Sequence, residues 1–149
     1  MPRRIFRVCR SLHASLDGEG ARRVGGRWNS PGRSVVYMAE TVSLAVLENL
    51  VHMAKVDFPA GYVVVAVVIP DQVRVLRAED LPAGHRPVSQ KKLGDQWIES
   101  LASAVLEVRS TVVPIEHNYL LNPKHPDFAQ ITAEPPVAFV FDERLFGAR

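Results

Sequence analysis

The stretch YVVVAVVI at residues 62–69 decides the fold class of this chain. A continuous apolar run rich in β-branched residues is typical of a strand that is covered on both faces. Eight residues are far too few for a helix that spans a bilayer, which needs about 20. The run therefore predicts a central strand of a globular sheet.

Shorter apolar stretches on both sides of this run predict further strands, and two amphipathic stretches predict helices. The first helix is expected from Val42 to about Lys55, with Thr41 as its N-cap. The second is expected from Gln90 to about Val105. The remaining strands are expected at 5–9 (a short edge strand), 34–39, 73–76, 108–113, 118–121 and 137–141, the last of them buried.

These elements predict the α+β class, with a mixed β core of six or seven strands flanked by two helices. Strands dominate the second half, so the order does not alternate as in a β-α-β fold. Glycines and charges make 17–26 and 79–87 expected loops. In the first helix one apolar face is expected to hold five side chains, namely Leu44, Leu47, Leu50, Val51 and Ala54.

The composition fits one ordinary domain over residues 1–149, because 47% of the residues are hydrophobic and 23% are charged. Lys plus Arg number 18 and Asp plus Glu number 16, a balance that argues against a dedicated nucleic-acid binder. Cys9 is the one cysteine, which excludes an internal disulfide and a thiolate-rich zinc cluster. With no apolar leader or membrane span in the sequence, we expect a cytoplasmic protein.

The segment GGRWNSPG at 25–32 is the first candidate for chemistry. Glycines allow a ligand to approach the backbone closely, and an adjacent arginine can donate two parallel hydrogen bonds to a phosphate. Trp28 can offer a flat apolar face. The alternative is a surface hairpin in which Arg27 is solvated and Trp28 belongs to the core, and spacing alone favours this alternative.

Two further candidates rest on single polar side chains. Glu48 is expected at the edge of the apolar face of the first helix, where a carboxylate is partly desolvated; the alternative is an exposed pair with His52, four residues on. Ser110 is expected on the same strand face as Val112, and the alternative is a core serine that bonds the backbone. His117, His125 and Asp127 match no standard metal-ligand spacing, so 118–128 is expected to be an ordered loop.

Four segments, taken in order, resemble the RES domain family, which is named for an Arg, a Glu and a Ser. The segments are GGRWNSPG (25–32), VVYMAE (35–40), SLAVLENLVH (43–52) and RSTVVPIEHNYLLNPKHPDF (109–128). The resemblance covers residues 5–141. It implies a fold resembling ADP-ribosyltransferases and a toxin of a toxin–antitoxin pair that degrades NAD⁺ by hydrolysis or phosphorolysis. It also implies a helix-turn-helix antitoxin of the Xre type as partner.

Carried over residue by residue, the resemblance implies Arg27, Glu48 and Ser110 as the catalytic set. It implies substrate binding by Tyr37 beside the nicotinamide, with Arg7, Trp28 and Asn118 completing the substrate-binding set. The family often has Pro-Ser where this chain has Arg109-Ser110, which leaves Thr111 as a minor rival to Ser110. The segment 81–88 has no counterpart that we can align.

These residue types suit cleavage of the bond between nicotinamide and ribose, which forms a sugar with oxocarbenium character. A carboxylate stabilises that positive charge, and the nicotinamide leaves as a neutral molecule. We therefore expect NAD⁺ as substrate and inorganic phosphate as a possible co-substrate, with neither a metal nor a further cofactor. No direct nucleic-acid or membrane contact is expected.

Two alternatives come from other classes of protein. One is an enzyme that transfers ADP-ribose to a protein or a nucleic acid. The other is a non-enzymatic module that binds nucleic acid through the arginines gathered in the first third of the chain. These are Arg3, Arg4, Arg7, Arg10, Arg22, Arg23 and Arg33. The simpler account of their excess is a basic pocket rim that attracts an anionic substrate.

Overall fold

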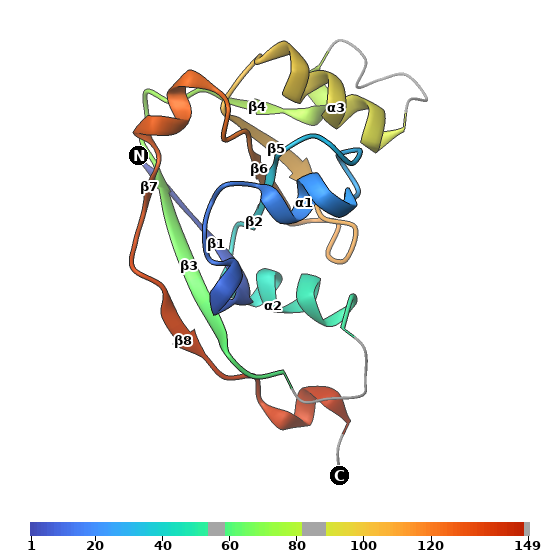
Figure 1. Ribbon diagram of the computed structural model, residues 1–149, viewed down its shortest axis with the longest axis vertical. Coiled ribbons are helices and arrows are strands. Elements are labelled where there is room, and N and C mark those ends of the chain that lie inside the picture. Colours follow the sequence, from blue (N-terminus) through green and yellow to red (C-terminus); the bar gives the residue numbers. More distant parts are fainter. Residues whose placement is uncertain (54–58, 82–88, 148–149) are drawn as a thin grey trace.

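The apolar stretch Tyr62–Ile69 forms strand β3 over its full predicted length, inside an eight-stranded sheet (Figure 1). The computed structural model describes residues 1–53, 59–81 and 89–147. The strand order is β4-β5-β6-β2-β1-β3-β7, and β8 also pairs with β3. β4 and β5 are parallel and the other pairs are antiparallel, so the sheet is mixed and the predicted α+β class is confirmed.

The described part of the chain holds eight strands and three α-helices, one helix more than predicted. The strands are β1 (Arg3–Arg10), β2 (Val36–Ala39), β3 (Tyr62–Ile69), β4 (Val75–Arg77), β5 (Val105–Arg109), β6 (His117–Leu121), β7 (Thr132–Ala133) and β8 (Val137–Phe139). The helices are α1 (Glu19–Val24), α2 (Val42–Leu50) and α3 (Gln90–Ser100), with 3₁₀ turns η1 (Ser11–His13), η2 (Ala78–Asp80), η3 (Pro126–Gln130) and η4 (Glu143–Phe146).

Three predicted strands differ most from the observed ones, and β7 was not predicted. β1 is not an edge strand, because it pairs with β2 on one side and along its whole length with β3 on the other. β5 begins at Val105, three residues before the predicted start, and ends at Arg109. β8 is exposed rather than buried, since Val137 is 65% exposed; only Phe141, beyond the strand, is buried.

Both predicted helices are shorter than expected. Thr41 caps α2 as predicted, its hydroxyl accepting from the Leu44 amide at 3.0 Å, but the helix ends at Leu50 and the predicted remainder from residue 54 lies outside the described residues. α3 ends at Ser100, and Leu101 closes it in the left-handed region with φ 53°. No glycine marks that end, which is why the sequence pattern carried the helix onward. Conversely, α1 occupies the predicted loop 17–26.

The two faces of the sheet are covered differently. On one face α3 and the segment around Trp28 cover β5 and β6, while α2 covers β1 and β2, each with its own apolar cluster. In Figure 1 α3 lies near the top of the view and α2 below it, near the middle. The opposite face carries the largest cluster, which includes Ile5, Cys9 and Val65.

The predicted apolar face of α2 is only partly correct. Leu44 and Ala45 are the buried residues, and Leu50 packs partly against the same cluster, whereas Leu47 and Val51 are exposed. Because the buried stripe runs through Leu44 and Ala45, Glu48 lies at its edge and is half-buried. The helix therefore places this carboxylate on the face of the sheet that α2 and α3 share.

Candidate functional site

Residues 25–33, here called the glycine loop, form a tight turn. The Gly26 amide donates to the Asn29 carbonyl at 2.9 Å, and Arg27 and Trp28 occupy the tip. The backbone at Gly26 lies so close to the Tyr37 side chain that it requires glycine, because a Cβ there would lie 2.7 Å from the Tyr37 hydroxyl oxygen. Gly25 has φ +74°, which favours glycine over any other residue.

Asn29 holds the glycine loop together from inside. It is fully buried, and its Nδ2 donates to the carbonyls of Ala21 at 2.9 Å and Arg33 at 3.1 Å, with a longer bond to Ser30. Its Oδ1 accepts from the Tyr37 hydroxyl at 2.7 Å. Sequence reasoning did not single out Asn29, although asparagine is typical of turns because its side chain bonds nearby backbone.

The hydroxyl of Tyr37 is committed to the glycine loop. It donates to Asn29 and accepts from the Trp28 amide at 3.0 Å. Burial raises the pKa of Tyr37 to about 12, while the Trp28 amide opposes this shift. The phenol is therefore neutral at physiological pH, and the ring remains as the part of Tyr37 that can meet a ligand.

For Trp28 the alternative interpretation is correct, because this side chain belongs to the core. Its side chain is 6% exposed and packs in the cluster that contains Leu93 and Trp97. Gly94 of α3 lies directly against its backbone, and Asp95 accepts from both the amide and the hydroxyl of Ser30. The tryptophan thus anchors the loop to α3.

Arg27, at the same tip, is exposed. No ion pair joins it to any residue that the structure describes, although it is close enough to Tyr37 to lower the pKa of that phenol slightly. Most other arginines of the first third are paired, as in Arg3–Glu107, Arg4–Glu134, Arg22–Glu19 and Arg33–Glu99. The guanidinium of Arg27 is therefore available to an anion.

Glu48, Ser110 and Asn118, here called the Glu48 cluster, meet at one carboxylate oxygen. Ser110 Oγ donates to Glu48 Oε1 at 2.7 Å, and Asn118 Nδ2 donates to the same oxygen at 2.8 Å. The predicted alternative of an exposed pair with His52 is wrong, because Glu48 is half-buried and bound by Ser110 and Asn118, and among the described residues no ion pair joins it to His52. The structure thus brings Glu48 together with two residues that lie 62 and 70 positions further along the chain.

Ser110 uses its whole hydrogen-bonding capacity inside the protein. Its hydroxyl donates to Glu48 and accepts from the amides of Val112 at 3.1 Å and Val113 at 3.0 Å. A hydroxyl has one proton and two lone pairs, so none is left for a ligand. Val112 lies in this turn and not on a strand face with Ser110, as the sequence pattern had predicted, because β5 ends at Arg109. Thr111, the minor rival, is exposed.

Strand register places the Glu48 cluster and Tyr37 on one face of the sheet. Asn118 pairs with Ala39, and Tyr37 precedes Ala39 by two residues, about 7 Å along the strand. Arg7 is not part of this arrangement. Every second residue of β1 lies on the same face, so Arg7 shares a face with Ile5 and Cys9, and it pairs with Val65 of β3. This is the opposite face of the sheet. Arg7 lies there beside the Cys9 thiol, whose pKa is raised by burial.

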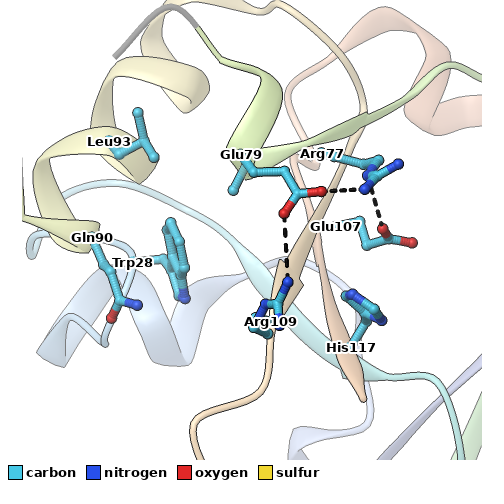
Figure 2. Close-up of a pocket in the computed structure, with 9 residues that line it drawn as sticks. Trp28, Arg77, Glu79, Gln90, Leu93, Glu107, Arg109 and His117 are labelled. Atoms are coloured by element: carbon cyan, nitrogen blue, oxygen red, sulfur yellow. Dashed lines mark hydrogen bonds and ion pairs between the residues drawn. The ribbon is translucent and has the colours of Figure 1, made fainter. Parts of the chain in front are cut away.

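A pocket of about 220 Å³ lies where β4 and β5 end and β6 begins (Figure 2). Trp28 and Leu93 give it an apolar wall. Glu79 reaches between two arginines, hydrogen-bonded to Arg77 and 3.7 Å from Arg109, as Figure 2 shows. Sequence reasoning missed this group because only the pairing of β4 with β5 brings its members together.

The histidines form no metal centre among the described residues. His125 Nδ1 accepts from the Asp127 amide at 3.0 Å, which caps η3; the predicted ordered loop is therefore confirmed for the part that follows β6, whereas residues 118–121 belong to that strand. His117 lines the pocket instead. No helix in the described parts of the chain is long and apolar enough to cross a membrane.

Comparison with known proteins identifies the family of this chain. The profile of the RES domain matches residues 2–142. A protein named Toxin Res from Yersinia enterocolitica is 38% identical over 149 residues, covering 95% of this chain and 98% of that protein. Prs ADP-ribosylating toxin from Sphingobium sp. is 37% identical over 152 residues, covering 95% and 94%.

The fold is shared with known structures, one of which is the MbcT-MbcA toxin-antitoxin complex of M. tuberculosis. It matches with a TM-score of 0.70 and 17% identity over 99% of this chain and 88% of that one. At this identity the likeness concerns the fold alone, and it supports the mixed sheet with few helices described above.

Proposed function

The chain belongs to the RES domain family, and from this premise we propose that it is a toxin that breaks the bond between nicotinamide and ribose in NAD⁺. The observation that carries the proposal is the Glu48 cluster. A half-buried carboxylate is held by two donors on one oxygen, on the same sheet face as the ring of Tyr37. The names of the relatives, which include two different toxins, support the toxin role.

In the proposed reaction the bond between ribose C1′ and the nicotinamide nitrogen breaks, and nicotinamide leaves with the electron pair. The positive charge that develops on the ribose is stabilised by the carboxylate of Glu48. The oxygen of water or phosphate then forms the new bond to C1′. A water nucleophile releases one proton, and the products are ADP-ribose or its 1-phosphate.

The glycine loop contributes binding in this proposal. Arg27 is exposed and unpaired among the described residues, so its guanidinium can donate two hydrogen bonds to the pyrophosphate. The ring of Tyr37 offers an apolar surface to nicotinamide. We also propose a cytoplasmic location, because NAD⁺ is abundant there, and an antitoxin of the Xre type as partner.

The direct test is to incubate the purified chain with NAD⁺, with and without inorganic phosphate, and to follow nicotinamide by chromatography. We expect nicotinamide release, and a phosphate requirement would identify a phosphorylase rather than a hydrolase. Folded protein without antitoxin that releases no nicotinamide in either buffer would refute the proposal.

A second candidate function is transfer of ADP-ribose to a macromolecule, and it is favoured by the 37% identity to Prs ADP-ribosylating toxin. The same incubation, with NAD⁺ labelled in the adenosine part and with cell extract added, separates the two functions. Label that stays in small molecules supports cleavage. Label that precipitates with protein or nucleic acid supports transfer.

Arg27→Ala tests the anion contact in cells. We expect it to abolish growth arrest on induction, because the exposed guanidinium is lost and nothing else at the loop tip replaces it. Arg23→Ala is the matched control, since Arg23 is also exposed and its contact with Glu19 is long, at 3.9 Å. Growth arrest that persists in soluble Arg27→Ala protein would contradict the assigned role.

A further inference from the structure

The Glu48 carboxylate is bound on one side only. Both of its hydrogen bonds, from Ser110 and from Asn118, end on Oε1. Among the described residues no hydrogen bond reaches Oε2, and Oε2 is not one of the buried polar atoms that lack a partner. The second oxygen is therefore open, and the carboxylate has one oxygen bound by the protein and the other free of any hydrogen bond from the described residues.

Asn118 carries an unusual polar atom. Its Oδ1 is the single buried side-chain nitrogen or oxygen without a hydrogen-bond partner in the described part of the chain. A buried acceptor without a partner destabilises the fold, and an apolar side chain of similar size would avoid that penalty. The amide is thus a poor choice for stability, whereas its Nδ2 is a direct donor to Glu48.

We propose that Asn118 is a positioning residue, which acts with Ser110 to fix Glu48 through Oε1 so that Oε2 faces the ribose during cleavage. This inference rests on the proposed function. It replaces the expected direct contact of Asn118 with the substrate, because the amide nitrogen is engaged with Glu48 and the amide oxygen is buried. The Ser110 hydroxyl likewise has no hydrogen-bonding capacity left for a ligand. Ser110 and Asn118, which were both expected at the substrate, therefore hold Glu48 instead.

Asn118→Leu is the decisive variant, because it removes both the donor and the unpaired acceptor at nearly constant volume. We expect kcat for nicotinamide release to fall on the order of 10- to 100-fold. KM for NAD⁺ should stay within about twofold, and the melting temperature should be equal to or above that of the wild type. If Asn118 had a merely structural role, its replacement would not be expected to lower kcat while the melting temperature stayed equal or rose.

Val108→Ala is the matched control, because Val108 pairs with Asn118 across β5 and β6 and is buried. It should lower the melting temperature by leaving a cavity and keep kcat near the wild-type value. An unchanged kcat in Asn118→Leu would overturn the inference. A raised KM at constant kcat would also overturn it, since that result identifies a direct substrate contact.

Asn118→Asp keeps the inference testable if the leucine variant does not fold. When ionised, the new carboxylate cannot donate to Oε1, but on protonation it can. We therefore expect the ratio of variant to wild-type kcat to rise as the pH falls, and a ratio independent of pH would overturn the inference. His52 and His117 are common to both proteins, so this ratio compares the residue at position 118 against the same surroundings. Wild-type protein without turnover would refute the proposed function instead.

Discussion

The glycine loop and the Glu48 cluster lie on the same sheet face but are built in opposite ways. In the loop, Asn29 and Ser30 have their polar side chains hydrogen-bonded, Asn29 in part to Tyr37 of β2, and Trp28 is packed against α3. In the Glu48 cluster one carboxylate oxygen is open and the amide oxygen of Asn118 is unpaired. The difference indicates that the loop secures the fold, while the cluster leaves two oxygens without a hydrogen-bond donor among the described residues, an arrangement that the proposed role of Glu48 would use.

The sharpest test of this comparison is Glu48→Gln. The amide oxygen can still accept from Ser110 and Asn118 in place of Oε1, so we expect the melting temperature to change little. The negative charge is lost, however, and we expect kcat for nicotinamide release to fall about 10²- to 10³-fold. Thermal unfolding and nicotinamide chromatography on the same preparation check both parts. A large loss of stability would show that the cluster also holds the fold.

The second largest effect is expected from Gly94→Ala, on the loop side. A Cβ at this position would lie 1.8 Å from the Trp28 carbonyl oxygen, so α3 and the glycine loop must move apart. Overpacking of this kind costs about 1–3 kcal/mol of unfolding free energy or more, measurable by urea unfolding.

Gly20→Ala provides the control, because nothing lies within 4 Å of a Cβ there and the residue is in the helix α1. Alanine favours helix over glycine, so we expect unchanged or slightly increased stability. Equal stability of the two variants would show that the loop is not anchored through Gly94.

The sequence predicted well those helices and strands that have a clear hydrophobic pattern. It predicted only in part which residues of the site come into contact. β3 was exact because its apolar run has clear ends, and the cap at Thr41 was found because hydroxyls are strong caps. The end of α3 at Leu101 carries no glycine, and the start of β5 was therefore placed too late. The sequence pattern therefore predicts the ends of a helix or strand correctly where residues at those ends determine them.

The assignment of the site residues shows the same limit. The resemblance implied Glu48, Ser110 and Asn118, and the fold joins them through contacts 62 and 70 residues apart in the chain. Which carboxylate oxygen of Glu48 accepts the two hydrogen bonds depends on side-chain geometry. The spacing of residues in the sequence does not predict it. The resemblance implied Arg7 as a substrate-binding residue, but Arg7 lies on the face opposite α2; alternation along a strand tells which residues share a face and not which face meets a helix.

The smallest effect is expected from Tyr37→Phe, which removes the hydroxyl between Asn29 and the Trp28 amide. Leaving these two groups without their partner should cost about 1–2 kcal/mol of unfolding free energy at pH 7, with urea unfolding as the measurement. Because the ring is retained, we expect KM for NAD⁺ to stay close to the wild-type value. A large rise in KM would show that the loop geometry, and not only its stability, depends on this hydroxyl.

The pH dependence of the same variant isolates the Tyr37 hydroxyl. In the native chain the pKa of Tyr37 is raised to about 12 by burial, whereas an unfolded tyrosine titrates near pH 10. Between about pH 10 and 12 the unfolded chain has already released this proton and the folded chain has not, so the stability of the wild type falls as the pH rises. Tyr119, whose pKa is also about 12, and Cys9 are present in both proteins and cancel in the difference. The stability gap between wild type and Tyr37→Phe should therefore narrow above pH 10, and a constant gap would mean that the phenol is not buried in the loop.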